Sequence, residues 1–196
     1  MKILVILGHP SPGSLNHAIA ARVKETLLLK GHQVIFHDLY AEKFDPMLPT
    51  EEIKKDGRVD DIILKHCEEL INCDGIVIIH PNWWGMPPAI LTGWIDRVIR
   101  PGVAYRFVEG DSGEGVPEGM LKAKTALVIN TSDTKEIREN EIFGDPLERI
   151  WKDCIFGLCG IFNVHRKIIR IVVTSSAEER KNWLDETTEL TNKLFS

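Results

Sequence analysis

Two apolar runs in this chain each end in a loop of small and hydrogen-bonding residues. The first run covers residues 3–7 and leads into a Gly-His-Pro sequence at 8–10, and the second covers 76–79 and leads into a stretch rich in Pro and Trp over 80–88. Each pattern predicts a buried strand, then a loop, then a helix. Ligands bind beyond the carboxyl ends of the strands in an open parallel sheet, so we expect these loops to share one site.

The rest of the chain alternates between helical and strand patterns. Apolar residues four apart predict a helix over 16–30 that ends at Gly31, and Pro87 and Pro88 suit the start of a helix over 89–98. The remaining strands are predicted over 33–37, 125–130 and 167–173. Further helices are predicted over 146–158, over 176–194, where Ser176 and Glu179 have capping-box spacing, and in the segment marked by Ile62, Ile63, Cys67, Leu70 and Ile71. Between these elements we expect a long excursion with Pro46, Pro49 and Gly57 and a surface loop over 109–119.

This alternation calls for parallel strands joined by right-handed helical crossovers, with helices on both faces of the sheet. We expect an α/β, doubly wound, flavodoxin-like three-layer sandwich whose five-stranded parallel sheet has the order 2-1-3-4-5. That order places the loops at Gly8, His80 and Thr131 on one edge. The chain has 196 residues and no compositional break, so we expect a single domain over 1–196.

Composition narrows the functional classes. The net charge of −5 and the lack of a Lys/Arg block argue against nucleic-acid binding, and the apolar stretches are too short to cross a bilayer. The first strand starts almost at Met1 and leaves no room for a signal peptide, so we expect a cytoplasmic protein without membrane insertion. Cys67, Cys73, Cys154 and Cys159 lack metal-ligand spacing and fit apolar helical faces. They are interpreted as small core residues, with a disulfide or zinc as the alternative.

The candidate loops carry groups suited to a flat, phosphorylated ligand. Ser14 and Asn16 lie where a strand turns into a helix N-terminus, which predicts either a phosphate cradle or simple helix capping. Trp83 and Trp84 either wall a planar heterocycle or pack in the core or at a subunit contact. Residues 130–134 suit either the polar edge of that heterocycle or a solvated turn.

Other motifs are less informative. Neither G-x-G-x-x-G nor the P-loop lysine motif is present, no metal site is expected, and Trp94 is expected to pack in the core. His9 and His80 lie in the candidate loops and are the histidines of interest. The other histidines are interpreted as surface or helix residues without an identified partner, namely His17, His32, His37, His66 and His165.

Four segments occur in a distinctive order, namely Gly8-His9-Pro10, Ser14-Leu15-Asn16, Asp38-Leu39-Tyr40 and residues 80–98. In this order they resemble the NAD(P)H:quinone oxidoreductase family, flavodoxin-like flavoenzymes that include DT-diaphorase and the ancillary oxidoreductases of bacterial potassium-efflux systems. The block over 80–98 is long and specific, whereas the resemblance becomes loose from about residue 135 onward.

The resemblance implies a homodimer with tightly bound FAD or FMN that passes hydride from NAD(P)H to a quinone or similar electrophile by a ping-pong cycle. It implies that the flavin phosphate and ribityl chain are held by His9, Ser14, Leu15 and Asn16. It places the isoalloxazine along Pro81, Asn82, Trp83, Trp84 and Gly85, with its pyrimidine end at Thr131, Ser132 and Asp133. It assigns the pocket for nicotinamide and quinone to Tyr105, Phe107 and Phe143, and no side chain is assigned as catalytic because the flavin carries the chemistry.

The chain also departs from the family pattern. Animal members carry a histidine and an upstream tyrosine that stabilise negative charge on the reduced flavin, and the matching positions here are Phe143 and Ile137. Ser132 and Asp133 stand where two glycines are common, and an ionised Asp133 near the flavin opposes that negative charge. We therefore expect a lower flavin reduction potential than in the histidine-bearing members.

Several choices stay open at this point. FAD is slightly favoured over FMN because Asn16 and Ala18 are kept, and the choice between NADH and NADPH is undecided. A second hypothesis is a regulatory flavoprotein docked on a membrane transporter of the potassium-efflux type. A third is a one-electron carrier of the flavodoxin type.

Overall fold

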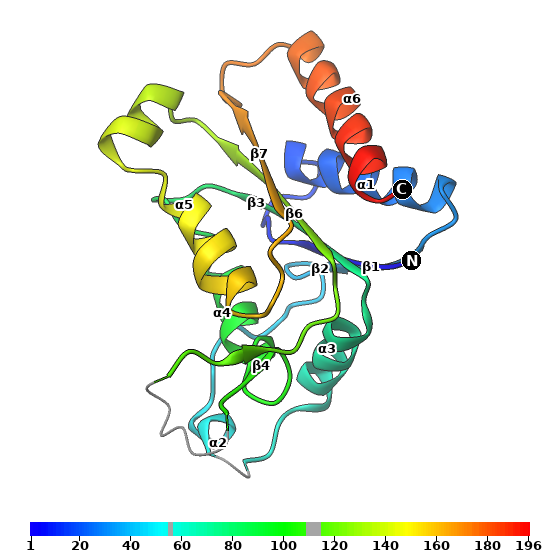
Figure 1. The fold of residues 1–196 in the computed structure, drawn as a ribbon. Helices are drawn as coiled ribbons and strands as arrows, with labels where there is room; N and C mark the ends of the chain where they lie inside the picture. Colours follow the sequence, from blue (N-terminus) through cyan, green and yellow to red (C-terminus); the bar gives the residue numbers. More distant parts are fainter. Residues whose placement is uncertain (55–56, 109–114) are drawn as a thin grey trace.

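A computed structural model of the protein describes residues 1–54, 57–108 and 115–196. Its centre is a parallel sheet with the strand order β2-β1-β3-β6-β7 (Figure 1). The strands are β1 (Lys2–Leu7), β2 (Gln33–Asp38), β3 (Gly75–Pro81), β6 (Thr125–Ser132) and β7 (Val164–Arg170). The predicted five-stranded sheet of order 2-1-3-4-5 is confirmed.

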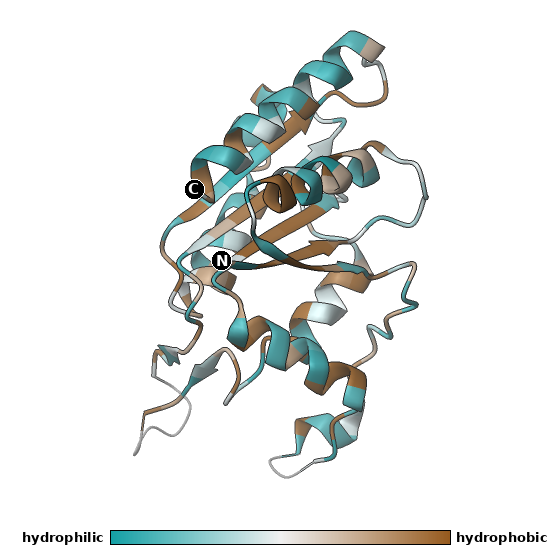
Figure 2. Cartoon of the chain, turned by 90° about the vertical axis from the view of Figure 1, so that its right-hand side faces the viewer, coloured by the Kyte–Doolittle hydropathy of each residue, from teal (hydrophilic) through white to brown (hydrophobic). Residues whose placement is uncertain are grey.

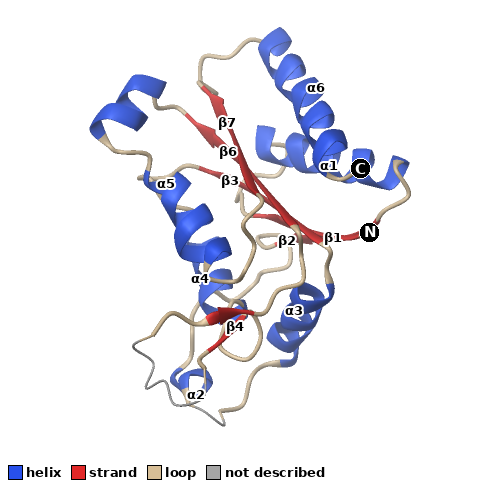
Figure 3. Cartoon of the chain, in the orientation of Figure 1, coloured by secondary structure: helices blue, strands red, loops and turns tan. Residues whose placement is uncertain are grey.

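Helices cover both faces of this sheet and confirm the three-layer sandwich (Figure 3). One face is covered by α1 (Leu15–Leu29) and α6 (Ala177–Leu194). The other face is covered by α3 (Asp61–Asn72), α4 (Ala89–Val98) and α5 (Pro146–Arg149). None of the described helices combines the length and apolar character that a membrane crossing needs.

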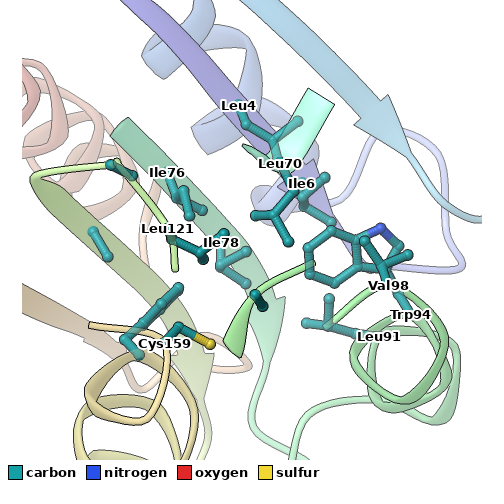
Figure 4. Close-up of a cluster of buried hydrophobic side chains, with 14 of the residues drawn as sticks. Leu4, Ile6, Leu70, Ile76, Ile78, Leu91, Trp94, Val98, Leu121 and Cys159 are labelled. Carbon is teal, nitrogen blue, oxygen red and sulfur yellow. The ribbon is translucent and has the colours of Figure 1, made fainter. Parts of the chain in front are cut away.

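Successive side chains of each strand enter opposite layers of the core. Leu4 and Ile6 of β1 join Ile76 and Ile78 of β3 in the layer under α3 and α4, where they gather with Trp94 (Figure 4). The residues between them on each strand face α1 and α6. Burial on both faces explains why β1, β3 and β6 have nearly continuous apolar sequences, which Figure 2 shows as brown strands between helices of mixed teal and brown.

Most helix predictions are confirmed by burial. Ile19, Val23 and Leu27 of α1 are fully buried, and Trp94 is 1% exposed. At the start of α6, Ser176 Oγ accepts the backbone N–H of Glu179 in the predicted capping box. In α3, by contrast, Ile62 and Ile71 are exposed, and the buried side chains are those of Ile63, His66, Cys67 and Leu70.

The predicted fifth strand over 167–173 is three residues out, because β7 runs from Val164 to Arg170. The side chain of Arg166 is buried in this strand, where its guanidinium contacts Asn130 Oδ1 at 2.8 Å and the Asp145 carboxylate at 2.7 Å. Polar partners supplied by other elements thus replace the apolar pattern on which the prediction relied.

The predicted helix over 146–158 changes its winding after α5. Residues Ile150–Gly157 form a π-helix, η2. Trp151 and Phe156 are five residues apart, and both are buried with their rings stacked at 5.6 Å. A π-helix brings residues at this spacing to the same face.

Two further expectations need correction. Cys154 is exposed rather than packed in the core, although Cys67, Cys73 and Cys159 are buried, and all four thiols are free. Residues 109–114 of the predicted loop lie outside the described residues, and its end forms β5 (Glu118–Gly119), which pairs with β4 (Tyr105–Arg106). The excursion after β2 contains the short helix α2 (Thr50–Ile53).

Candidate functional site

Three loops meet at the carboxyl edge of the sheet. The register pairs Pro81 of β3 with Thr131 of β6. The backbone N–H of Gly8 donates to Ile79 O at 2.9 Å, and that of Asn82 donates to Thr131 O at 2.7 Å. Backbone hydrogen bonds therefore tie the loop after β1 to the end of β3 and the loop after β3 to the end of β6.

The loop after β3 folds into a tight turn that projects Trp84. Trp83 and Met86 exchange backbone hydrogen bonds of 3.1 and 3.0 Å. Between them, φ is 59° at Trp84 and 74° at Gly85, as is typical of a type I′ turn. A Cβ on Gly85 would lie 2.7 Å from Cγ of Pro146, so the close approach of α5 requires glycine.

The conformation of Trp84 indicates a ligand-facing role. Positive φ is rare for a bulky residue, and such strained positions cluster at functional sites. The Trp84 side chain is 96% exposed. Packing in the core is therefore excluded for Trp84, which leaves a wall for a planar heterocycle or a subunit contact.

A buried carboxylate supports this turn from below. Asn82 Oδ1 accepts the N–H of Gly85 at 2.9 Å, and Asn82 Nδ2 lies 3.0 and 3.1 Å from the two carboxylate oxygens of Glu139. Glu139 is 1% exposed and belongs to the short π-helix η1 (Arg138–Ile142). Through Asn82, Glu139 fixes the shape of the turn.

The sequence analysis missed Glu139. It is one of several acidic residues in a polar stretch, and its neighbours Glu136 and Glu141 are exposed. Its burial depends on the winding of η1, which no periodic pattern in the sequence announces.

A cavity of about 1000 Å³ opens beside this turn. This is at the upper end of the volume range for cofactor and ligand pockets. Its walls combine aromatic and aliphatic side chains with charged and amide groups: Asn82, Trp84, Gly85, Asp133, Thr134, Lys135, Ile137, Arg138, Glu139, Phe143, Pro146 and Ile171.

Five of the residues that the resemblance assigned to the site line this cavity, namely Asn82, Trp84, Gly85, Asp133 and Phe143. Pro81, Thr131 and Ser132 are buried at the strand ends and belong to β3 and β6 rather than to loops. Asp133 is the first exposed residue after β6, and its Oδ1 accepts the N–H of Val173 at 2.8 Å.

The first loop adjoins the cavity without lining it. The ring centroids of His9 and Trp83 are 6.5 Å apart, and Asn16 Nδ2 donates to Thr131 Oγ1 at 2.9 Å. Asn16 is buried and its Oδ1 has no hydrogen-bond partner among the described residues. A buried acceptor left open in this way is a candidate contact for a bound ligand.

At the start of α1, Ser14 caps the helix, and its Oγ accepts the backbone N–H of His17 at 3.4 Å. Ser14 is the N-cap and the half-buried Leu15 is the first helical residue. The N–H of Ser11 donates to Nδ1 of His9 at 3.1 Å, so a neutral His9 carries its proton on Nε2. Burial is the main cause that lowers the pKa of His9, which favours this neutral form.

His17 was interpreted as lacking a partner, and that interpretation is wrong. Its Nδ1 lies 2.8 Å from Ser14 Oγ, and its Nε2 lies 3.1 Å from Asp38 Oδ2. The three side chains connect the start of α1 to the end of β2. Fold topology supplies the partner, because Asp38 is distant in the sequence.

Tyr105 and Phe107 lie apart from the cavity within one chain. Tyr105 belongs to β4, which lies beside α4 at the opposite end of the molecule from the cavity loops (Figure 1). The two rings contact each other edge to face with centroids 6.0 Å apart. Neither residue lines the cavity.

His80 is a core residue rather than a ligand-facing group. Its Nδ1 lies 2.8 Å from Pro81 O, and its Nε2 accepts the indole N–H of Trp151 at 3.0 Å. Complete burial lowers the pKa of His80 to about 4, so the ring is neutral near pH 7. Both ring nitrogens have partners, and the side chain ties η2 to β3.

His66 is also buried and partnered. Its Nδ1 accepts the indole N–H of Trp94 at 3.1 Å, and burial is the main cause that lowers its pKa to about 3. His66 also lies close enough to His37 and Glu42 for the three to surround an ion. However, a neutral ring that accepts at Nδ1 carries its proton on Nε2, the atom that faces Glu42. The hydrogen bond from Trp94 therefore opposes metal coordination by His66.

Comparisons with known proteins agree with this fold. Residues 1–190 match the model of a family described as having a flavodoxin-like fold. The chain is 31% identical over 189 residues to a Haemophilus influenzae protein named "Uncharacterized NAD(P)H oxidoreductase", with 94% of this chain and 91% of that protein covered. It is 30% identical over 182 residues to rat "NAD(P)H dehydrogenase [quinone] 1", with 81% of this chain and 65% of that protein covered. The crystal structure of Smu.1420 from Streptococcus mutans superimposes with a TM-score of 0.85 at 30% identity, covering 99% of this chain and all of that one.

The buried histidines predict a pH-dependent stability. The pKa values of His66 and His80 are about 3 and 4 in the folded chain, below the ordinary value of about 6.5. Between these values the unfolded chain binds protons that the folded chain does not, so the stabilisation is complete above about pH 6.5 and is lost as the pH falls. We expect urea denaturation to show a free energy of unfolding that drops from about pH 7 to pH 5, with a slope that approaches roughly 1.4 kcal/mol per pH unit for each histidine below about pH 6.5.

The substitution of His66 measures the contribution of one of these histidines to the pH dependence of stability. His66→Gln removes one titrating group and should flatten the pH profile, whereas His165→Gln at the more exposed edge strand should leave it unchanged. A wild-type stability that stays constant over this pH range would contradict the assignment.

The contact between Glu139 and Asn82 predicts a stability difference between variants. Glu139→Ala leaves the amide of Asn82 without its acceptor, so the free energy of unfolding should fall by about 1–3 kcal/mol. Glu139→Gln keeps one acceptor oxygen and should lose less. Glu141→Ala is the matched control in the same helix, and its effect should stay within about 0.5 kcal/mol. Equal denaturation midpoints for Glu139→Ala and Glu141→Ala would refute the supporting role.

Proposed function

This chain belongs to the flavodoxin-like fold family that includes the Haemophilus influenzae NAD(P)H oxidoreductase and the rat NAD(P)H dehydrogenase, and on that premise we propose that it is a flavin-dependent NAD(P)H oxidoreductase. Its substrates are quinones or similar flat electrophiles, which it reduces by two electrons in a ping-pong cycle. The names of these relatives do not refer to a transporter or to a one-electron carrier, so neither alternative is proposed.

The observation that carries this proposal is the Trp84 ring, held out of the core by a left-handed turn at the wall of a large cavity. An isoalloxazine needs apolar walls and a few fixed polar contacts. Trp84, Phe143 and Ile137 supply apolar surface, and Asn82 and Asp133 supply polar groups at the same cavity. The residues present therefore fit a flavin.

Individual residues have separate tasks in this proposal. The N-terminus of α1, with His9, Ser14, Leu15 and Asn16, holds the phosphate, and the open Oδ1 of Asn16 accepts a hydroxyl of the ribityl chain. The planar ring lies along Pro81, Asn82, Trp83, Trp84 and Gly85. Its pyrimidine end lies at Thr131, Ser132 and Asp133.

The flavin supplies the hydride chemistry when it is bound, and the chain supplies position and environment. Trp84 and Phe143 exclude water from the reacting face, which strengthens the electrostatic effect of nearby charges. Asn82 and Glu139 keep the turn in one shape, so the reacting groups meet in a fixed geometry. Proton transfer by a side chain is not required in this scheme.

FAD is the proposed cofactor, with FMN as the alternative, and NAD(P)H is the electron donor. We also propose a homodimer. Phe107, Val116 and Phe162 expose 41%, 88% and 85% of their side chains in the half of the molecule that contains β4, and exposed apolar groups often mark contact surfaces. In such a dimer, the partner subunit's Tyr105 and the partner subunit's Phe107 complete the substrate pocket that one chain leaves open.

Absorption spectroscopy tests the proposed function. Purified protein supplied with FAD or FMN should retain a flavin band, lose it on anaerobic addition of NADH or NADPH, and regain it with menadione. Trp84→Ala should raise the dissociation constant for the flavin roughly tenfold, equivalent to about 1.4 kcal/mol, without lowering stability. The control is Leu29→Ala, which removes a side chain that is 82% exposed at the far end of α1.

Two results would reject the proposal. One is a protein that retains no flavin under any of these conditions. The other is a bound flavin that neither nicotinamide nucleotide reduces.

The charge at Asp133 predicts the potential of the bound flavin. Its carboxylate is held at the cavity by the N–H of Val173, where it opposes negative charge on the ring. Asp133→Asn should therefore raise the reduction potential, by about 30 mV for each tenfold change in the two-electron equilibrium. A dye-coupled redox titration measures this shift, with Asp96→Asn on α4 as the control. An unchanged or lower potential in Asp133→Asn would show that this carboxylate does not act on the flavin.

A further inference from the structure

Ser14, His17 and Asp38 form a continuous chain of hydrogen-bonding groups at the start of α1. We propose that this chain couples binding of the anionic end of the flavin to uptake of one proton by His17. The inference rests on the proposed function, because the ligand concerned is the phosphate end of that cofactor.

The geometry allows two protonation states with different donors. In the neutral state, Nε2–H of His17 donates to Asp38 over 3.1 Å, and Nδ1 accepts the hydroxyl proton of Ser14 over 2.8 Å. In the protonated state both ring nitrogens donate, so Ser14 Oγ accepts from Nδ1–H. Its own hydroxyl proton is then released to point elsewhere.

Protonation of His17 favours an anion at this helix end in two ways. The anion receives the freed Ser14 hydroxyl as a donor and a positive charge one helical turn away. The N–H of His17 is capped by Ser14 Oγ at 3.4 Å, whereas the first two N–H groups of α1 lack intrahelical partners, and the helix dipole adds positive potential there. The buried Oδ1 of Asn16, which lacks a partner among the described residues, independently indicates a ligand beside the same turn.

Two titratable groups face His17 from neighbouring elements. Asp38 at the end of β2 stabilises the protonated ring, whereas the His9 ring, 6.0 Å away in the loop after β1, opposes a second positive charge. Burial keeps His9 toward its neutral form, which leaves His17 as the group that takes up the proton.

Coupling of this kind is reciprocal. If an anion favours the protonated state of His17, then a lower pH must favour binding of the anion. FAD is the suitable probe because its diphosphate has no ionisation in this range, whereas the monoester of FMN has one near pH 6. A pH dependence seen with FAD therefore originates in the protein.

The experiment compares FAD binding by fluorescence titration at about pH 6 and pH 8, together with proton uptake measured by calorimetry in two buffers. The wild-type protein should bind FAD about fivefold or more tightly at the lower pH and take up a fraction of a proton near pH 7. His17→Asn should abolish both effects. Asp38→Asn should reduce them, because an amide stabilises the protonated ring less than a carboxylate does. His165→Asn is the matched control and should behave as wild type.

The outcomes distinguish this inference from the proposed function. FAD affinity that does not change with pH, or wild-type binding without proton uptake, overturns the coupling and leaves the flavin assignment intact. Full pH dependence retained in His17→Asn also overturns it. Failure of the wild-type protein to bind either FAD or FMN at both pH values rejects the proposed function itself.

Discussion

The burial of a parallel sheet on both faces is the constraint on which the rest of this structure depends. Every residue of β3 from Gly75 to Pro81 is buried, and the register with β1 and β6 leaves almost no exposed position within the central strands. Polar groups able to meet a ligand are therefore confined to the points where these strands end. The N–H of Asn82, bonded to Thr131 O, marks the place where this edge begins. The position of the cavity is a consequence of how the sheet is covered.

Buried polar groups in this fold separate into two kinds. His80 has partners at both ring nitrogens, Pro81 O and the indole N–H of Trp151, and so tethers a helical layer without placing a charge in the core. His66 accepts the indole N–H of Trp94, but its Nε2 lacks a hydrogen-bond partner among the described residues and does not line the cavity. Asn16 keeps an acceptor without a protein partner at the edge of the sheet. A completed hydrogen-bond set indicates a structural role, and an incomplete one beside a cavity indicates a ligand. Residue type alone does not make this distinction.

The sequence predicts the strand order and the position of the site because both follow from hydrophobic patterning, which is strong in a sheet buried on two faces. The loop that contains Trp84 was found for the same reason, since it directly follows the apolar run over 76–79. Groups that depend on contacts between distant segments were missed. Glu139 meets Asn82 across 57 positions and His17 meets Asp38 across 21, and nothing local in the sequence records either contact. The boundaries of β7 failed likewise, because Arg166 is buried through partners elsewhere in the chain.

The two ends of the candidate site are held by different physical means. At the planar end, the turn of Trp84 is fixed by its backbone conformation and by the hydrogen bonds of Asn82 to Gly85 and Glu139. At the anionic end, Ser14 and His17 offer a hydrogen-bond pattern that changes with a single proton. A ligand that spans both ends is oriented by the rigid part, while the titratable part adjusts only the strength with which its charged end is held. In the proposed flavin complex, this separation would let the contact at the phosphate change the affinity with pH, while the turn of Trp84, held by backbone hydrogen bonds, would keep the ring in position.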